Sequence, residues 1–152
     1  MGRAILAVIA SYIVIFLVVF CGLTAAFLAM GVERAYQPAS YDVSTMWIVV
    51  MIVVGLIAAL AGGCVCRAIA RRPKPVVALA IVVLVLGLGQ AAMVMMTPVA
   101  AAEARPANVG VMEAMMKSRQ PMWTPWANAV IGFVGVLIGG GRLVKAGASN
   151  EP

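Results

Sequence analysis

The chain consists of long apolar stretches separated by short polar ones. The apolar stretches cover about residues 4–32, 43–66, 76–96 and 125–145, and their only charged residues are Arg142 and Lys145, in the last turns of the fourth stretch. About 20 helical residues, each rising 1.5 Å, cross a hydrocarbon core of about 30 Å. The pattern therefore predicts four transmembrane helices.

The longest polar connection, residues 98–121, contains a short amphipathic pattern. Met112 and Met116 recur with Val109 at helical spacing, and Glu113 lies four residues before Lys117, which favours an ion pair. Such a helix would lie in the membrane interface. We therefore expect a single integral all-α domain over residues 1–152, a bundle of four transmembrane helices with an interfacial helix in the third connection and a polar tail at 146–152.

Short polar residues and prolines predict where the helices begin. Asp42 or Ser44 is suited to cap the second helix, because a short oxygen side chain accepts a hydrogen bond from a free N–H of the first turn. Thr124 followed by Pro125 predicts the start of the fourth helix in the same way. Pro73 and the nearby Pro75 exclude a continuous helix between the second and third stretches.

The first apolar stretch has a secretory signal peptide as its competing interpretation, since a positive residue, Arg3, precedes it. The apolar core of a signal peptide is about 7–15 residues long. The stretch at 4–32 is roughly twice that length, so we expect it to be retained as a membrane helix.

Small residues recur at helical spacing in two of the predicted helices. The second helix carries Gly55, Ala59 and Gly63, and the fourth carries Gly132, Gly135 and Gly139. In lipid, small residues let helix backbones approach closely, and this packing holds helices together. We expect both stripes to be helix–helix contacts.

Composition agrees with a membrane protein. The chain is 64% hydrophobic and 11% charged, with a mean hydropathy of +1.09, whereas soluble domains have about 25% charged residues. The formal net charge of +6 does not predict nucleic-acid binding, because basic residues beside membrane helices set orientation and contact anionic lipid. The lipid bilayer is the expected partner.

The basic segment between the second and third helices predicts the orientation. Its cations are Arg67, Arg71, Arg72 and Lys74. Because short cytoplasmic segments are enriched in Lys and Arg, we expect this segment and both termini in the cytoplasm of a bacterial inner-membrane protein. Arg3, Arg142 and Lys145 then lie inside as well, and Arg34, Arg105, Lys117 and Arg119 lie outside.

The residues needed for most catalytic chemistry are missing. The chain has no histidine and three cysteines, Cys21, Cys64 and Cys66, without a CxxC pair. No Asp, Glu, Lys or Arg lies within the interior of a predicted span, which disfavours a proton-coupled transporter. We therefore expect neither an enzyme nor a bound cofactor.

Two features could form a binding site. Met93, Met96, Met112 and Met116 fall toward the outer end, and thioether sulfur suits Cu(I). Packing is the favoured explanation for them, because methionine fills gaps generically and no His or Cys joins the cluster. Gln90 is the one strongly polar side chain of the third helix, and we expect it to bond to a neighbouring helix, with a ligand contact as the alternative.

These observations favour a non-enzymatic membrane protein that acts through helix–helix association, either as an accessory subunit of a larger membrane partner or as a homo-oligomer. The alternative is a binding or transport protein for an apolar ligand or a soft metal at the Met-rich outer end. A glycine stripe facing lipid would favour the first interpretation. A cavity reaching Gln90 and the methionines would favour the second.

The predicted orientation can be tested with the cysteines at the inner boundary. An impermeant thiol reagent added to intact cells should not modify Cys64 or Cys66, because both would face the cytoplasm. Labelling is read by mass shift, with permeabilised cells as the positive control. Prompt modification in intact cells would contradict the predicted orientation.

Overall fold

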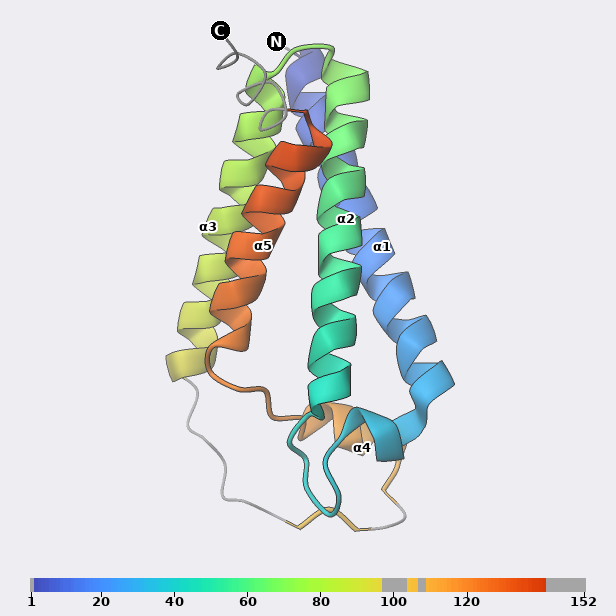
Figure 1. Cartoon of the computed structure of the whole chain (residues 1–152). Coiled ribbons are helices and arrows are strands. Elements are labelled where there is room, and N and C mark those ends of the chain that lie inside the picture. The colour runs from blue at the N-terminus through green and yellow to red at the C-terminus, as the bar shows by residue number, and fades with distance from the viewer. Residues whose placement is uncertain (1, 97–103, 107–108, 142–152) are drawn as a thin grey trace, which may run out of the picture.

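The structure is a computed structural model that describes residues 2–96, 104–106 and 109–141. These residues form five helices and no strand: α1 (Gly2–Ala35), α2 (Thr45–Ala70), α3 (Lys74–Met96), α4 (Val111–Met116) and α5 (Thr124–Gly139) (Figure 1). The expected all-helical architecture is confirmed for the described part of the chain. The predicted polar tail at 146–152 and the last residues of the predicted fourth span lie outside it.

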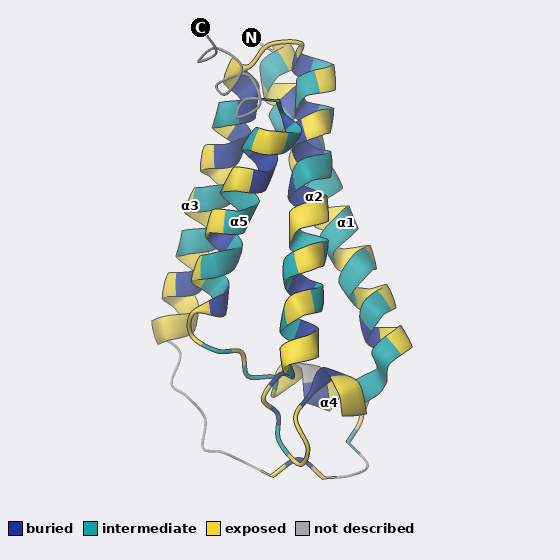
Figure 2. Cartoon of the chain, in the orientation of Figure 1, coloured by how far each residue is buried: buried dark blue, intermediate teal, exposed yellow. Residues whose placement is uncertain are grey.

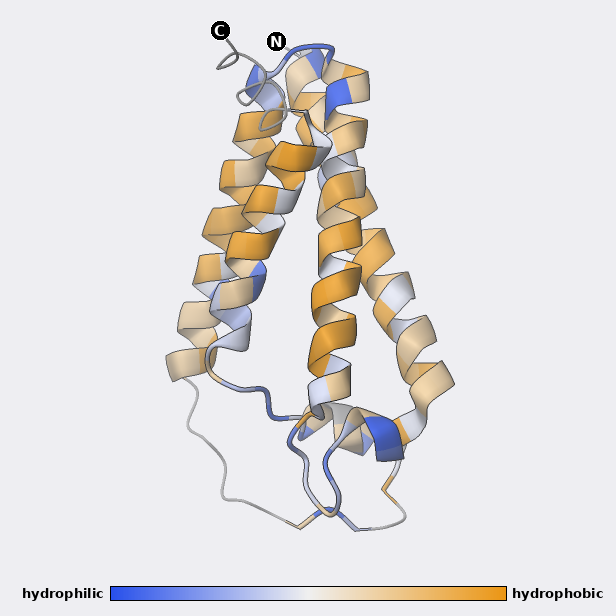
Figure 3. Cartoon of the chain, viewed as in Figure 1, coloured by the Kyte–Doolittle hydropathy of each residue, from blue (hydrophilic) through white to orange (hydrophobic). Residues whose placement is uncertain are grey.

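Three helices are long and apolar enough to cross a membrane, namely α1, α2 and α3, whereas α5 is an apolar helix of 16 residues. Large hydrophobic side chains face outward along them; Phe16 and Val85, for example, are each 60% exposed. Figure 2 shows exposed residues on the outer faces of the long helices, and Figure 3 shows hydrophobic colour along their length with hydrophilic residues at both ends. Apolar surface of this extent fits a helical membrane protein.

The helices define two ends of the molecule (Figure 1). The hinge end holds the start of α1, the turn between α2 and α3, and the end of α5. The loop end holds the connection between α1 and α2, the short helix α4 and the start of α5. These two names are used below.

Local bonding shifts several helix boundaries from their predicted places. Helix α2 continues past residue 66 to Ala70, and Arg71 ends it in a left-handed conformation, φ 53°, with its N–H donated to the carbonyl of Arg67. Ser44, not Asp42, caps α2, since its hydroxyl accepts from the N–H of Trp47 at 3.1 Å. Helix α1 reaches Ala35 but breaks its helical conformation at Gly31, where φ is 72° and glycine has no steric penalty.

The predicted cap at Thr124 is wrong. The cap position of α5 is Trp123, which makes no side-chain capping bond, and Thr124 is already the first helical residue. The N–H of Thr124 is donated to the carbonyl of Pro121 at 3.0 Å, so a backbone turn leads into the helix. The buried Thr124 hydroxyl has no partner among the described residues.

Two separate clusters of buried residues hold the helices. At the hinge end, small and branched side chains from α1, α2, α3 and α5 meet, including Ala7, Ala59, Leu79 and Val136. At the loop end, the cluster is aromatic and joins only α1, α2, their connection and α4: the Phe27 and Trp47 rings are 5.5 Å apart, edge to face. Helices α1, α2, α3 and α5 therefore meet in one cluster only at the hinge end.

Pairwise packing explains this shape. Helix α1 packs along α2, and α5 packs against both α2 and α3, whereas contacts between α1 and α3 are few. Figure 1 shows the pair α1–α2 diverging from the pair α3–α5 toward the loop end. The sides of α1 and α3 that face each other are therefore only partly covered by other helices.

Helices α2 and α5 approach backbone to backbone. A Cβ atom placed on Gly63 would overlap the carbonyl oxygen of Val136 and lie 2.8 Å from the nitrogen of Gly140, and one on Gly139 would overlap the carbonyl of Leu60. Gly135 is in similar contact, 2.7 Å from the Ala59 Cβ. These stripe residues are therefore used inside one chain.

The other members of the stripes differ in their surroundings. A Cβ on Gly132 would lie 2.9 Å from a Val83 methyl group, so this glycine lies against α3 rather than α2. A Cβ on Gly55 would meet nothing within 4 Å. Gly55 is therefore the one stripe glycine, among those described, that faces open space.

The α2–α5 contact predicts opposite effects for two matched substitutions. Gly63→Ala should lower the free energy of unfolding by about 1–3 kcal/mol, because the methyl group forces two backbones apart. Gly55→Ala should leave it unchanged or raise it by up to about 1 kcal/mol, since the methyl group meets nothing and alanine favours the helix. Steric-trapping unfolding in bicelles measures both. Equal effects at the two positions would contradict the contact.

Candidate functional site

A cavity of about 690 Å³ lies where α1 and α3 fail to meet. Helices α1, α3 and α5 and the segment before α5 supply its walls. The lining residues are Tyr12, Ile15, Phe16, Val19, Val83, Leu86, Gly87, Gln90, Val94, Ser118, Gln120, Pro125, Asn128 and Ala129. Pockets that take small molecules are about 300–1,000 Å³ in volume, so this one is large enough for a ligand.

Helical spacing explains why these side chains share one space. The α1 wall follows positions 12, 15, 16 and 19, and the α3 wall follows 83, 86, 87, 90 and 94, each of which forms one face of a helix. Gly87 lets α5 close one side, because a Cβ at this position would lie 2.8 Å from the Ala129 Cβ. The α1 and α3 faces are therefore turned to the cavity.

The wall at the loop end is held by backbone hydrogen bonds. Ser118 and Gln120 line the cavity on either side of Arg119. The N–H of Arg119 is donated to the carbonyl of Tyr41 at 2.9 Å, and the N–H of Val43 is donated to the carbonyl of Arg119 at 3.0 Å. The connection between α1 and α2 thus fixes the segment that carries these two polar side chains.

A second set of contacts holds the segment around Arg105 against the end of α1 and the connection between α1 and α2. The guanidinium of Arg105 is 3% exposed; it pairs with Glu33 at 3.0 Å and donates to the carbonyl of Ser40 at 3.1 Å. Glu33 follows the break in α1, beyond the apolar stretch, and its hydrogen bond with Arg105 and the charge of that residue lower the pKa of its carboxyl group. The ion pair ties residues 104–106 to the end of α1, and the bond to Ser40 ties them to the connection between α1 and α2.

The polar groups of the cavity are neutral and unpaired. The Tyr12 hydroxyl and the side-chain amides of Gln90 and Asn128 have no hydrogen-bond partner among the described residues. No residue lining the cavity is charged. Tyr12 and Gln90 are exposed and Asn128 is half-buried, so these groups are open to hydrogen bonds with water or with a ligand that fills the cavity.

Of the candidate binding residues chosen from the sequence, the structure places Gln90 at the cavity and the four methionines elsewhere. Gln90 lines the cavity, whereas the bond to a neighbouring helix expected for it is absent among the described residues. Tyr12 and Asn128 were not singled out from the sequence. Each is a polar side chain within a predicted span, and that signal could have identified them.

The methionine candidates do not gather at the cavity. Met93 and Met96 lie at the loop end of α3 and are 72% and 84% exposed, while Met112 and Met116 belong to α4. Figure 1 shows that end of α3 and α4 at separate places, and α4 packs on α1 and α2 through Ala114. None of the four lines the cavity. The ion pair predicted on α4, Glu113 with Lys117, is present at 3.3 Å.

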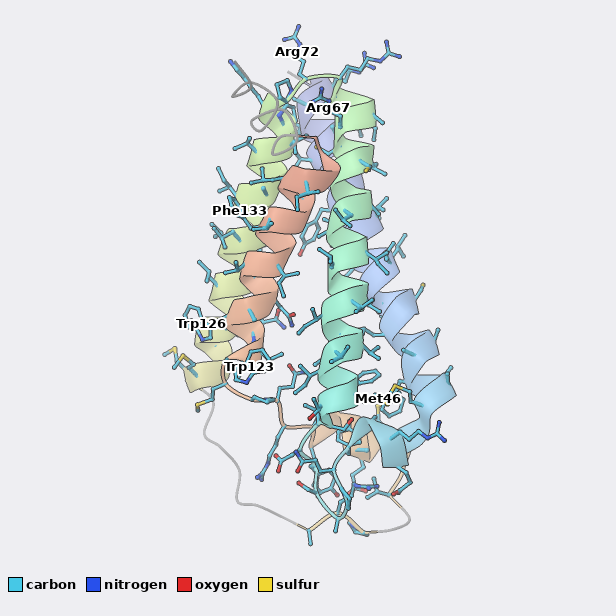
Figure 4. All side chains as sticks on the ribbon, in the orientation of Figure 1. Met46, Arg67, Arg72, Trp123, Trp126 and Phe133 are labelled. Atoms are coloured by element: carbon cyan, nitrogen blue, oxygen red, sulfur yellow. The ribbon has the colours of Figure 1, made fainter. Side chains whose placement is uncertain are left out.

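The basic segment lies at the hinge end. Figure 4 places Arg67 and Arg72 there and the aromatic pair Trp123 and Trp126 near the start of α5. The Cys64 thiol is exposed and donates to the carbonyl of Gly139 at 3.2 Å, whereas Cys66 is buried. Cys64 is therefore the cysteine that informs on orientation.

Comparison with known protein families, with curated proteins and with solved structures finds no match for this chain. The cavity, its unpaired polar groups and its absence of charge are thus the observations on which a function can be based. Its chemistry suits binding of an uncharged molecule that is partly apolar and partly able to form hydrogen bonds.

Water access from the loop end can be tested with single cysteines. In a protein with Cys21 and Cys64 changed to alanine, Gln90→Cys should react with a water-soluble methanethiosulfonate about tenfold faster than Val85→Cys, since thiolates form in water. Val85 is exposed on the same helix but does not line the cavity. The parent, which retains only the buried Cys66, is the blank. Equal rates at the two positions would show that the cavity is closed to water.

Proposed function

We propose that this protein binds an uncharged lipid in the cavity between α1, α3 and α5, with the apolar body of the lipid against the helices and a hydroxyl or carbonyl group toward Gln90 and Asn128. One observation carries the proposal: unpaired, neutral hydrogen-bonding side chains surround an otherwise apolar space of about 690 Å³. A ligand with both kinds of surface satisfies those groups and fills the space.

The membrane arrangement is part of the proposal. Helix α5 serves as a fourth span, and its packing against α2 and α3 supports this role. The exposed Trp123 and Trp126 suit the headgroup region, and α4 lies in the interface of the same side. With both termini in the cytoplasm of a bacterial inner membrane, the cavity lies in the outer half of the bilayer.

The lining favours binding over catalysis. It contains no histidine, cysteine, carboxylate or amine that could act as a nucleophile or a general base with an activated partner. A charged substrate would lose hydration without meeting an opposite charge. The protein therefore acts on its ligand by holding it, not by reaction.

Association with a second copy or a larger membrane partner has less support. That interpretation relied on the glycine stripes, and Gly63, Gly135 and Gly139 contact residues of their own chain. Gly55 alone among the described stripe glycines remains open. We therefore rank binding in the cavity above assembly, reversing the order that the sequence favoured.

The proposal predicts saturable capture of a neutral lipid. Purified protein in phosphatidylcholine nanodiscs is irradiated with a diazirine-bearing diacylglycerol, with unlabelled diacylglycerol as competitor. Cross-links should map to the α1 and α3 faces of the cavity. Gln90→Leu with Asn128→Leu should weaken capture by about 5–150-fold, since each of the two lost hydrogen bonds contributes about 0.5–1.5 kcal/mol.

Matched controls separate a site from general lipid contact. Leu86→Trp fills the cavity and should abolish competition, whereas Val85→Trp, on an adjacent exposed face, should leave it intact. Labelling that is equal in all variants, or that the competitor does not reduce, would overturn the proposal. A defined oligomer with no bound neutral lipid would instead favour helix–helix association as the function.

A further inference from the structure

We infer that the hinge end carries a second site, for an anionic phospholipid, in a groove between α1 and α3. The groove has a volume of about 370 Å³ and is lined by Ala4, Ile5, Val8, Ile9, Lys74, Pro75 and Ala78. It is separate from the neutral cavity in its residues and in its charge. The inference does not depend on the proposed function.

The groove is shaped for an acyl chain. Apart from Lys74, every lining side chain is apolar, and the small side chains of Ala4 and Ala78 leave space between the helices. Ile5 and Ile9 are 60% and 54% exposed, so the groove continues onto the surface that faces lipid. A chain lying there buries apolar surface on both helices.

Unpaired positive charge lies in the turn that leads to Lys74, the one charged residue that lines the groove. Arg71, Arg72 and Lys74 are exposed, and none of their side chains has a hydrogen-bond or ion-pair partner among the described residues. Two other cations of the hinge end are already engaged. Arg3 donates to the carbonyl of Ile69 at 2.9 Å, and Arg67 donates to the carbonyl of Gly140 at 3.3 Å.

No described acidic residue balances this charge. The acidic residues that the structure places, Glu33, Asp42 and Glu113, all lie at the loop end. The charged residues described at the hinge end are therefore all basic, and Figure 3 shows hydrophilic residues at this end. Basic pockets between membrane helices bind the phosphate groups of anionic lipids.

The backbone of the turn keeps these cations together. Arg71 stands in the left-handed conformation, with its N–H on the carbonyl of Arg67, which ends α2 abruptly. Helix α3 begins at Lys74, immediately after Pro73. Three cations thus fall within one tight turn, and the positive end of the α3 dipole adds to their field.

A phospholipid fits this arrangement better than a soluble anion. A free phosphate would engage the cations alone and leave the apolar groove empty. A phospholipid places its phosphate at the turn and its acyl chain between α1 and α3, so that one molecule satisfies both surfaces.

Competition between lipids tests the site. Native mass spectrometry of the purified full chain, in detergent with equal amounts of phosphatidylglycerol and phosphatidylcholine, should show preferential retention of phosphatidylglycerol. Lys74→Gln and Arg72→Gln should each lower that preference about fivefold, the ratio that corresponds to about 1 kcal/mol per cation. Arg34→Gln, which removes an exposed cation at the loop end, should not change it.

A matched pair of substitutions on α3 tests the groove separately from the charge. Ala78→Leu should reduce phosphatidylglycerol retention without changing the charge, while Ala92→Leu, an exposed alanine of α3 outside the groove, should have no effect. Elution volume and helicity verify that each variant is folded. Equal binding of the two lipids, an equal loss in Arg34→Gln, or no loss in Ala78→Leu would overturn the inference. Full displacement by millimolar inorganic phosphate would also overturn it, by assigning the cations to a free anion.

Discussion

The approach of α2 and α5 without intervening side chains determines how the other helices are placed. Because Gly63 and Gly139 lie against opposing backbone, α5 is held tightly to α2. Helix α3 is in turn held to α5 through Gly87 against Ala129, and α1 is held to α2. Helices α1 and α3 are attached to different partners, so they are not drawn together, and the space between them remains open. The same small residues that tighten one contact therefore create the cavity.

The long connection before α5 is held at the loop end by polar contacts. The bonds of Arg119 with Tyr41 and Val43, and the ion pair of Arg105 with Glu33, fasten the long connection to the shorter one. Because the aromatic cluster joins only α1, α2, their connection and α4, these bonds are what brings the segment before α5 to this side. They also set the position of the polar cavity wall.

The sequence predicted the long helices well because their signal is local: an apolar run long enough to cross a bilayer needs no knowledge of the rest of the fold. It also identified Gly63 and Gly139 as small contact residues, but spacing alone could not say that they face each other. The end of α2 at Ala70 depends on Arg71 adopting a left-handed conformation, which hydropathy does not report. The cavity could not be predicted either, because it depends on which pairs of helices pack closely and which make few contacts.

One face of α1 connects the two proposed sites. Positions 4, 5, 8 and 9 line the basic groove, and positions 12, 15, 16 and 19 line the neutral cavity, which continues the same helical face. Both spaces exist because α3 contacts this face so little. Their chemistry nevertheless differs, since Lys74 lies at one end and the amide of Gln90 lies toward the other. A single unpacked face can thus hold two lipids at once, sorted by charge: the cations at the hinge retain an anionic lipid that no charge in the cavity would accommodate, and the unpaired amides retain a neutral one that gains nothing from the hinge.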